Sequence, residues 1–241
     1  MTPTTFRSPY FALLESYAPQ LLAGPEARVP QPRTQTLAAG QVGIFGLLGQ
    51  NDWFADTDYT AIRANVRRAL ADSSVRTIDL VIDSPGGSCL GLPEAASAIA
   101  EANRVKPVRA FVTGIAASAA YWLASQASTV TVTPSGEVGS IGVLDMHVGI
   151  SDALKQAGVE VTAVASSPQK IERAPFTVLS DEARQHMQRG VDEWYGQFLT
   201  AIRRGRGARV SATGNYGGGR MLSAKAALAE GLVDFVSGGV L

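Results

Sequence analysis

The chain has 241 residues, with 21 Lys and Arg side chains against 21 Asp and Glu, so its formal net charge is zero. A neutral chain has no overall attraction to nucleic acid or to anionic lipid, and a content of 46% hydrophobic residues excludes a wholly disordered chain. A single cysteine, Cys89, cannot form an intramolecular disulfide or a cysteine-based metal site, which excludes a disulfide-bridged secreted scaffold.

No apolar stretch approaches the roughly 20 residues that a transmembrane helix requires. Glu15 and Pro19 interrupt the amino-terminal segment where a secretory signal would have its apolar core. We therefore expect a cytoplasmic protein that binds neither a membrane nor nucleic acid.

Residues 1–33 are expected to precede the main domain. A Ser-Pro pair opens residues 8–22 and predicts a short amphipathic helix there. Residues 24–33, GPEARVPQPR, are too rich in proline for the interior of an element and predict a linker. The domain is expected to span residues 34–241.

Strand and helix patterns alternate beyond the linker. In chain order they are a strand at 36–48, a helix at 57–71, a strand at 77–83, a helix at 92–103, a strand at 108–112, a helix from 118, strands at 129–133 and 141–147, a helix at 151–156, a strand at 159–165, a long helix capped by Ser180, a helix at 223–229 and a strand at 232–236. The run TIDLVID is apolar on both faces, which is typical of a buried parallel strand. The alternation predicts an α/β fold with a mostly parallel sheet.

Asp83 to Gly87, DSPGG, follow the most apolar predicted strand. Paired glycines let backbone N–H groups approach a ligand closely, as in an oxyanion hole or an anion nest. The same residues are also ordinary turn chemistry, so a simple strand-to-helix turn remains the alternative.

Ser118 lies among small residues, in GIAASAAYW, where a predicted strand passes into an apolar helix. A hydroxyl at a helix start is close to free N–H groups, and small neighbours let a substrate carbonyl approach. Ser118 is therefore a candidate nucleophile. The alternative is a serine packed among alanines.

A serine nucleophile needs a base, and the candidates are His147, His186 and Lys170. His147 ends a predicted strand and His186 lies within the long helix, where each could have an ordinary structural role. Lys170 lies in the proline-flanked loop SSPQKIERAPF, and an amine acts as a base only when it is neutral, which requires dehydration. These residues by themselves leave the identity of the base open.

Two further features have ordinary interpretations. Cys89 has no histidine near it in sequence and is expected to be a small buried side chain rather than a nucleophile. The arginines that end the long helix are expected to be a solvated end: Arg203, Arg204, Arg206 and Arg209.

Five sequence blocks together resemble the signal peptide peptidase A-like serine peptidases. In chain order they are VIDSPGGS at 81–88, GIAASAAYWLAS at 114–125, GEVGSIGV at 136–143, SSPQKIERAPFTVLSDE at 166–182 and AKAALAEGLVD at 224–234. The resemblance implies the Clp protease/crotonase-like fold, a spiral of ββα units with a mostly parallel sheet. It also implies a serine endopeptidase that needs no metal or organic cofactor.

The resemblance assigns roles to individual side chains. It implies that Ser118 is the nucleophile and Lys170 the base of a Ser/Lys dyad, and that Ser140 orients the lysine amine. A lysine base predicts activity that rises from neutral to alkaline pH.

The resemblance also places the oxyanion hole at backbone N–H groups of Gly86 or Gly87 and of Ala119. Ala119 and Ala120 stand where many relatives have two glycines. That departure keeps a backbone donor but narrows the rim that faces the substrate.

The helix and proline-rich linker before the domain resemble the phage capsid-assembly branch of the family, whose members process scaffold and coat proteins inside the prohead. We expect the substrate to be a protein or peptide bound in extended form beside the strand edge near Asp83 to Ser88. Relatives that look like two fused copies complete their site between halves, and this chain has one copy. We therefore expect a homo-oligomer in which Ser118 and Lys170 meet across subunit boundaries.

Other functions remain open. One is a cellular signal-peptide-peptidase-like enzyme, and another is a Clp-like peptidase that uses Ser118, His147 and Asp145. A third is a crotonase-like acyl-CoA enzyme, which has no use for a serine nucleophile, and a fourth is a non-catalytic assembly module. Labelling of Ser118 by a fluorophosphonate would separate the peptidases from the last two.

Overall fold

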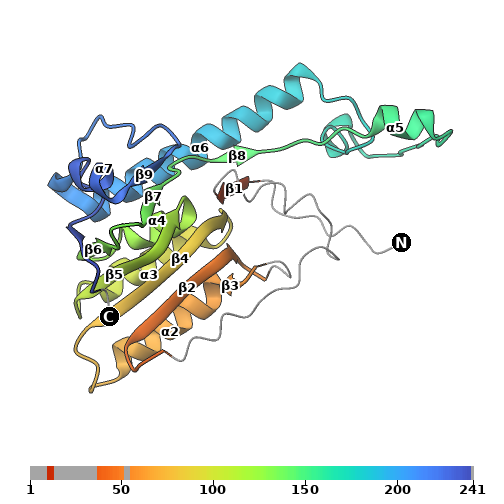
Figure 1. Cartoon of the computed structure of the whole chain (residues 1–241). Coiled ribbons are helices and arrows are strands. Elements are labelled where there is room, and N and C mark those ends of the chain that lie inside the picture. The colour runs from red at the N-terminus through yellow and green to blue at the C-terminus, as the bar shows by residue number, and fades with distance from the viewer. Residues whose placement is uncertain (1–9, 14–36, 52–54, 240–241) are drawn as a thin grey trace.

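The computed structural model describes residues 10–13, 37–51 and 55–239 (Figure 1). A twisted sheet with helices packed against it forms the body, and a long arm projects from one end of the body (Figure 1). The expected linker and domain boundary lie outside the described residues.

Strands and helices alternate along most of the described chain. The strands are β1 (Tyr10–Leu13), β2 (Gln41–Gly49), β3 (Thr57–Asp58), β4 (Ile78–Ser88), β5 (Val108–Ala117), β6 (Thr129–Val132), β7 (Glu137–Gly139), β8 (Leu144–Asp145), β9 (Met221–Ser223) and β10 (Phe235–Val236). The helices are α2 (Tyr59–Ala71), α3 (Leu92–Ala102), α4 (Ala119–Ala124), α5 (Ser151–Gln156), α6 (Asp181–Arg206) and α7 (Ala224–Ala229), with 3-10 turns η3 (Pro168–Lys170) and η4 (Gly207–Arg209).

The centre of the body is a parallel sheet. β4 pairs in parallel with β2 and with β5, β5 pairs with β6, and β6 pairs with β10. Leu80, Val81 and Ile82 of β4 are all at most 2% exposed although consecutive side chains point to opposite faces, so this part of the strand is covered on both faces. This arrangement confirms the predicted α/β fold with a mostly parallel sheet.

Polar caps define where the helices begin. The Asp58 side chain accepts a hydrogen bond from the N–H of Thr60 at the start of α2. The Ser180 hydroxyl accepts one from the N–H of Ala183, which confirms the predicted start of α6. Among the described residues, no helix combines the length and apolar character that crossing a bilayer requires.

The arm consists of the chain between β8 and α6 (Figure 1). Its two legs are joined by a hydrogen bond from the N–H of Ile150, directly before α5, to the carbonyl of Pro175 at 2.7 Å. Helix α5 contains no buried residue, and every residue from 155 to 170 is exposed. The arm therefore has no core of its own within one chain.

Several predicted elements need correction. Residues 10–13 form a strand that pairs with β4 and β8, so the helix predicted over 8–22 is wrong at these positions, and the remaining residues of that prediction lie outside the described chain. The strand predicted at 141–147 is reduced to β8, while β7 was not predicted. Residues 159–165 form no strand, because they run along the exposed arm and have no neighbouring strand.

At the end of α6, Arg203 and Arg204 are exposed as expected, but the expectation of a solvated end is wrong for Arg206. The Arg206 side chain is fully buried, forms an ion pair with Asp234 at 2.9 Å and donates to the carbonyl of Gly231. Arg209 also pairs with Asp234, at 3.2 Å. Asp234 is the shared counter-charge of these two arginines, so the end of α6 and the following turn η4 are held to the chain before β10.

Cys89 follows the predicted structural role. Its side chain is fully buried, and burial raises the pKa of its thiol to about 12. A thiol in this state is a poor nucleophile near neutral pH.

Candidate active site

Ser118 lies at the junction of β5 and α4 and is fully buried. Its backbone φ is 53° and its ψ is −118°, a conformation that residues with a Cβ adopt rarely. The N–H of Ser118 donates to the carbonyl of Gly139 at 2.7 Å, and its own carbonyl accepts from the N–H of Trp122 at 3.0 Å. Contacts on both sides of the residue therefore hold the strained turn in place.

The local sequence explains how so tight a turn can be buried. Ala116, Ala117, Ala119 and Ala120 are all fully buried around the serine, because their small side chains let strand and helix approach closely. Farther along α4, Trp122 stacks on Phe198 of α6 with 4.8 Å between the ring centroids. The short helix is thus fixed by distant parts of the chain.

Strand β7 brings Ser140 level with Ser118. Ala117, the last residue of β5, pairs with Gly139, the last residue of β7, and a serine directly follows each strand. Ser140 also has a positive φ, 49°, and its N–H donates to the carbonyl of Arg220 at 2.9 Å. Two neighbouring strands therefore turn at the same level, each at a serine.

The hydroxyl of Ser118 donates to the carbonyl of Gly142 at 3.3 Å. The sequence does not single out Gly142, because a carbonyl acceptor is available on any residue and leaves no sequence signal. This contact directs the Ser118 hydroxyl toward the segment that follows β7.

The glycine pair lies on β4, which continues to Ser88 and does not end at the glycines. This corrects the interpretation of DSPGG as a turn. Ser84 of β4 pairs with Ala116 of β5 in the last pair between these two strands, and Gly86 and Ser118 each follow that pair by two residues. The two glycines therefore lie beside the serine.

Each of the two positions requires glycine for a different structural reason. Gly86 has a φ of 96°, which favours a residue without a Cβ, and a Cβ at Gly87 would collide with the carbonyl oxygen of Leu48. The N–H of Gly86 donates to the Ser84 hydroxyl at 3.1 Å, and that hydroxyl donates to the Gly46 carbonyl at 2.6 Å. Ser84 is thus a structural support for the glycine pair that the sequence pattern did not reveal.

Ala119 supplies the other backbone donor expected at the site. As the first residue of α4, it has an N–H with no acceptor within its own helix. This N–H follows directly after the serine, where an oxyanion-hole donor is useful.

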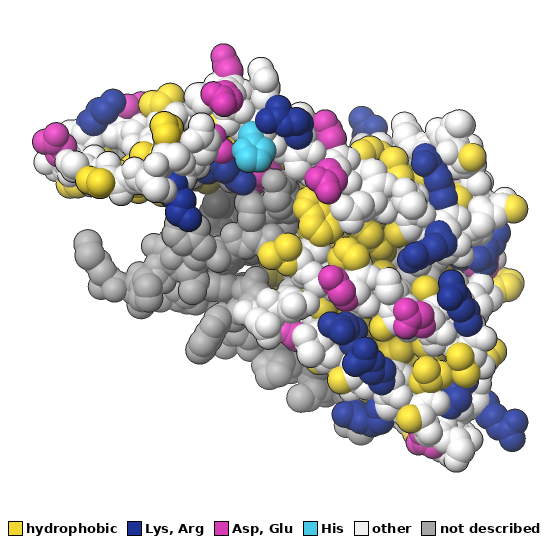
Figure 2. Space-filling model, turned by 180° about the vertical axis from the view of Figure 1, so that it is seen from behind, with side chains coloured by type: hydrophobic (Ala, Val, Ile, Leu, Met, Phe, Trp, Pro, Cys, Tyr) yellow, Lys and Arg dark blue, Asp and Glu magenta, His cyan; other side chains and the backbone are white. Residues whose placement is uncertain are grey.

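Lys170 is not brought to this site within one chain. It ends η3 on the exposed arm, which extends away from the sheet that carries Ser118 (Figure 1). Figure 2 shows the same arm from behind as a projection beyond the body. A single chain thus gathers Ser118, Ser140, the two glycines and Ala119, and leaves Lys170 apart.

Asp145 and His147 of the alternative triad, and His186, all contact residues of the arm. Asp145 forms an ion pair with Arg173 at 2.6 Å, and His147 Nε2 donates to the carbonyl of Ala174 at 3.2 Å. His186 contacts the carboxylate of Glu172 at 3.1 Å. Among the described contacts, none joins these histidines or Asp145 to Ser118.

Asp145 is itself in an unusual environment. Burial raises the pKa of its carboxyl, and the opposing effect of the nearby Arg173 does not fully compensate. Its side chain is 1% exposed, and its Oδ2 has no hydrogen-bond partner among the described atoms. Arg173 is three residues beyond Lys170, on the part of the arm that leads back to α6. Its ion pair with Asp145 holds that part of the arm against β8.

The parallel sheet, the strained serine between strand and helix and the neighbouring glycine pair define an α/β protein of the Clp protease/crotonase type. The chain belongs to peptidase family S49, whose family model matches residues 100–239. That range includes Ser118, Ser140 and Lys170. The match confirms the resemblance drawn from the sequence blocks.

Similar proteins include phage head proteins. The chain is 37% identical over 169 residues to the "Head-tail preconnector protein GP5" of Enterobacteria phage P21, covering 70% of this chain and 34% of that protein. It is 35% identical over 146 residues to the "Capsid assembly protease C" of Escherichia phage lambda, covering 61% and 33%. A third relative, "Putative protease MJ0651" of Methanocaldococcus jannaschii, is 30% identical over 165 residues, covering 68% and 53%. The matched region is thus about a third to a half of the length of these relatives.

Proposed function

We propose that this chain is a serine endopeptidase in which Ser118 is the nucleophile and Lys170 the general base. The observation that carries the proposal is the strained Ser118 turn, which places a buried hydroxyl directly before the N–H of Ala119 at the start of α4, two residues beyond the last pair that joins β5 to the glycine-bearing strand β4. Membership of peptidase family S49 supports the same chemistry.

The geometry supports an acyl-enzyme mechanism. Ser118 Oγ attacks the peptide carbonyl carbon while its proton passes to the Lys170 amine, and the oxyanion is held by the N–H of Ala119 and by one of the glycine N–H groups. The C–N bond then breaks, and the departing amine takes the proton from the lysine. Water hydrolyses the ester and restores Ser118. Each oxyanion donor contributes about 3 kcal/mol to the transition state.

The position of Lys170 supports a site that is shared between subunits. The lysine lies on an arm whose apolar side chains are in water within a single chain, including Val159, Val161 and Val164. In a ring of identical subunits, the arm of one subunit would cover these side chains against the body of the next. The same contact would dehydrate the lysine amine beside Ser118 of the neighbour, with Ser140 as a hydrogen-bond partner.

For the substrate we propose capsid or scaffold proteins cut during assembly of a phage head, in the cytoplasm of a bacterial host and within proheads. The names of the two phage relatives support this substrate class. No cofactor is required, because the serine, the lysine and the backbone donors supply the complete reaction.

The shared site is tested by mixing two inactive variants. Ser118→Ala and Lys170→Ala are each expected to lack peptidase activity, and a reassembled equal mixture should regain it, since about one boundary in four then pairs an intact serine with an intact lysine. The matched control mixes Ser118→Ala with the double variant Ser118→Ala/Lys170→Ala, which restores no intact pair. Light scattering verifies the assembly.

Two outcomes would contradict different parts of the proposal. A verified mixed oligomer that stays inactive, or an active wild-type monomer, would exclude a site shared between subunits. A wild-type chain that is not labelled at Ser118 by a fluorophosphonate and cuts no peptide would exclude the peptidase function itself.

A further inference from the structure

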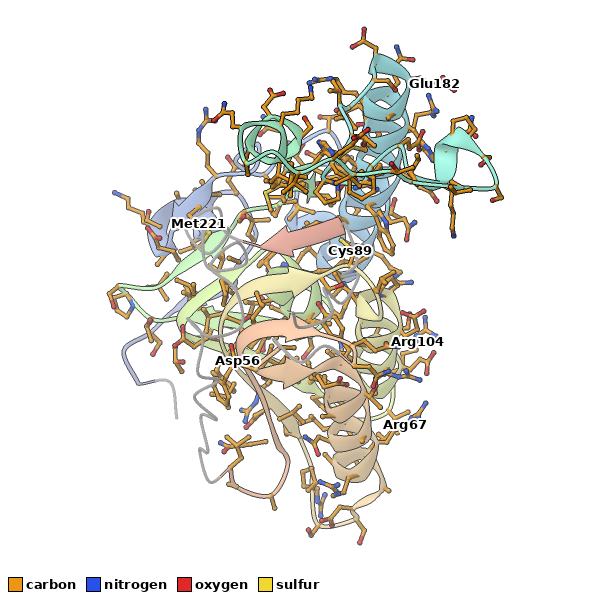
Figure 3. The ribbon with its side chains drawn as sticks, turned by 90° about the vertical axis from the view of Figure 1, so that its right-hand side faces the viewer. Asp56, Arg67, Cys89, Arg104, Glu182 and Met221 are labelled. Atoms are coloured by element: carbon orange, nitrogen blue, oxygen red, sulfur yellow. The ribbon has the colours of Figure 1, made fainter. Side chains whose placement is uncertain are left out.

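Strand β1 lies between β4 and β8 and is antiparallel to both (Figure 1). Phe11, Ala12 and Leu13 pair with Ser88, Gly87 and Gly86 in that order. On the other side, Tyr10 and Phe11 pair with Asp145 and Leu144. Figure 3 shows β1 beside the end of β4, next to the labelled Cys89. A short segment from the start of the chain therefore completes the sheet at the candidate site.

The edge of β4 that β1 occupies is the edge that β5 leaves. β2 pairs with one edge of β4 up to Gly87, and β5 pairs with the other edge up to Ser84. Beyond that point β5 turns at Ser118 into α4, so its edge of β4 becomes available to another strand. β1 takes this place over the three residues that end β4.

The register brings β1 to the level of the nucleophile. Gly86 and Ser118 each follow the paired residues Ser84 and Ala116 by two positions, and Leu13 is opposite Gly86. The chain runs from Tyr10 to Leu13 toward this level. The backbone of β1 therefore meets the site as an extended peptide aligned with the candidate oxyanion hole.

We infer that the slot between β4 and β8 is the binding site for an extended peptide substrate, and that residues 10–13 of the chain occupy it as an intramolecular competitor. The inference rests on the proposed peptidase function. Backbone pairing on two sides would give affinity that is largely independent of side chains. The Cβ-free Gly86 and Gly87 let a peptide backbone approach the β4 side closely.

When an intramolecular competitor fills the slot for part of the time, the apparent affinity for substrate equals the intrinsic affinity multiplied by the fraction of time for which the slot is free. A substrate has to displace β1 before it reaches Ser118. Weakening β1 should therefore tighten peptide binding without any change in the catalytic residues.

The test compares two alanine-to-proline variants in the Ser118→Ala background. Proline at Ala12 removes a backbone N–H inside a strand that has neighbours on both sides, which breaks its pairing. Ala39→Pro is the matched control, because Ala39 is exposed in a turn closed by the Gln41 N–H on the Ala38 carbonyl at 3.0 Å, with Gly40 at a φ of 85°. This turn accommodates proline at its second position.

The probe is a fluorescent peptide with the sequence of residues 8–14, SPYFALL, and binding is followed by polarisation. If β1 fills the slot for about nine-tenths of the time, the Ala12→Pro form binds about tenfold more tightly than the Ala39→Pro form. In the active background, Ala12→Pro should lower KM for peptide substrates and leave kcat unchanged.

Amide exchange confirms that the variant acts locally. Exchange at residues 86–88 and 144–145 should accelerate in Ala12→Pro while β2 and β5 stay protected. If proline unfolds the sheet, Ala12→Gly replaces it, because glycine weakens a strand without removing an N–H. The same tightening is then required.

Equal affinity of the test and control variants, or no binding to either, would overturn the inference. The proposed function fails by a different result. The affinities are measured with Ser118→Ala and do not depend on catalysis. If the wild-type chain has no peptidase activity but the two affinities differ, the proposed function is wrong and the peptide-binding slot stands. If the wild-type chain is active but the two affinities are equal, the proposed function stands and the role of β1 as a competitor is wrong.

Discussion

Ser118 stores backbone strain that its neighbours impose. With φ at 53°, its Cβ is crowded against the backbone, at a cost of about 1 to 3 kcal/mol. The hydrogen bond to Gly139 and the buried alanines around the turn keep the chain in this conformation. In this conformation the serine lies between strand and helix, and its hydroxyl donates to the carbonyl of Gly142.

We expect Ser118→Gly to be more stable than Ser118→Ala by about 1 kcal/mol, because glycine relieves the strain and loses part of that gain through the greater freedom of the unfolded chain. Both variants should be inactive. Urea unfolding with equal m-values measures the difference. An alanine variant that is the more stable of the two would show that the turn is not strained.

The glycine pair shows how two identical residues can serve different purposes. Gly86 is required by its positive φ, while Gly87 is required by the carbonyl of Leu48 on the adjacent strand. The sequence identifies both glycines as a candidate anion site. It does not separate these reasons, because the second depends on a strand about forty residues away.

At the scale of elements, strong local signals predicted structure correctly. The run of Ile78 to Ile82 indicates a buried strand because both faces are apolar, and Ser180 predicts the start of α6 because its side chain caps the first turn. Such signals are carried by the element itself, so they can be read from the sequence.

Elements that depend on a distant partner could not be predicted in this way. Residues 10–13 are a strand only because β4 and β8 offer free edges, and β7 has three residues and no periodicity of its own. Conversely, residues 159–165 alternate like a strand but have no partner within the chain. The candidate nucleophile was identified from sequence and resemblance, whereas the separation of Lys170 from it required the three-dimensional arrangement.

The buried ion pair between α6 and the chain before β10 predicts a pH-dependent stability. Burial opposes ionisation of Asp234, but hydrogen bonds from Arg206 and from the Val130 N–H, with the charges of Arg206 and Arg209, outweigh it and lower the pKa of the carboxyl. A lowered folded-state pKa means that the pair stabilises the fold above the unfolded pKa of about 3.8. This contribution is lost as the pH falls through the folded pKa.

We expect Asp234→Asn to lower the free energy of unfolding by about 3 kcal/mol at pH 7, since it leaves the Arg206 charge buried and unpaired. The difference from wild type should shrink at pH 3 and below. The control is Asp152→Asn, which removes an exposed pair with Lys155 and should leave stability unchanged. A difference that stays constant from pH 7 to pH 2 would contradict the assignment.

At the scale of the whole molecule, the arm is the feature that a single chain does not explain. It carries apolar side chains into solvent, with Val164 98% exposed and Val159 and Val161 also exposed. Figure 2 shows apolar surface on this projection, well away from the rest of the body. An apolar surface of this kind favours association with another protein surface, and a second copy of the chain is the occupant that would also bring Lys170 to Ser118.

We therefore expect Val164→Asp to weaken self-association and peptidase activity together. Burial of a valine is worth about 2 kcal/mol, and an aspartate in the same contact adds the cost of dehydrating a charge. Analytical ultracentrifugation should show a higher dissociation constant, and the activity per chain should fall on dilution and recover as the concentration is raised.

The matched control is Val105→Asp, since Val105 is 71% exposed in the turn after α3 and lies outside the arm. It should change neither the assembly nor the activity. Because a charge at a solvated position has little effect on folding, a loss confined to the arm variant would be caused by the contact and not by instability. Equal behaviour of the two variants, or an activity per chain that does not depend on concentration in either, would mean that the arm does not join subunits through Val164.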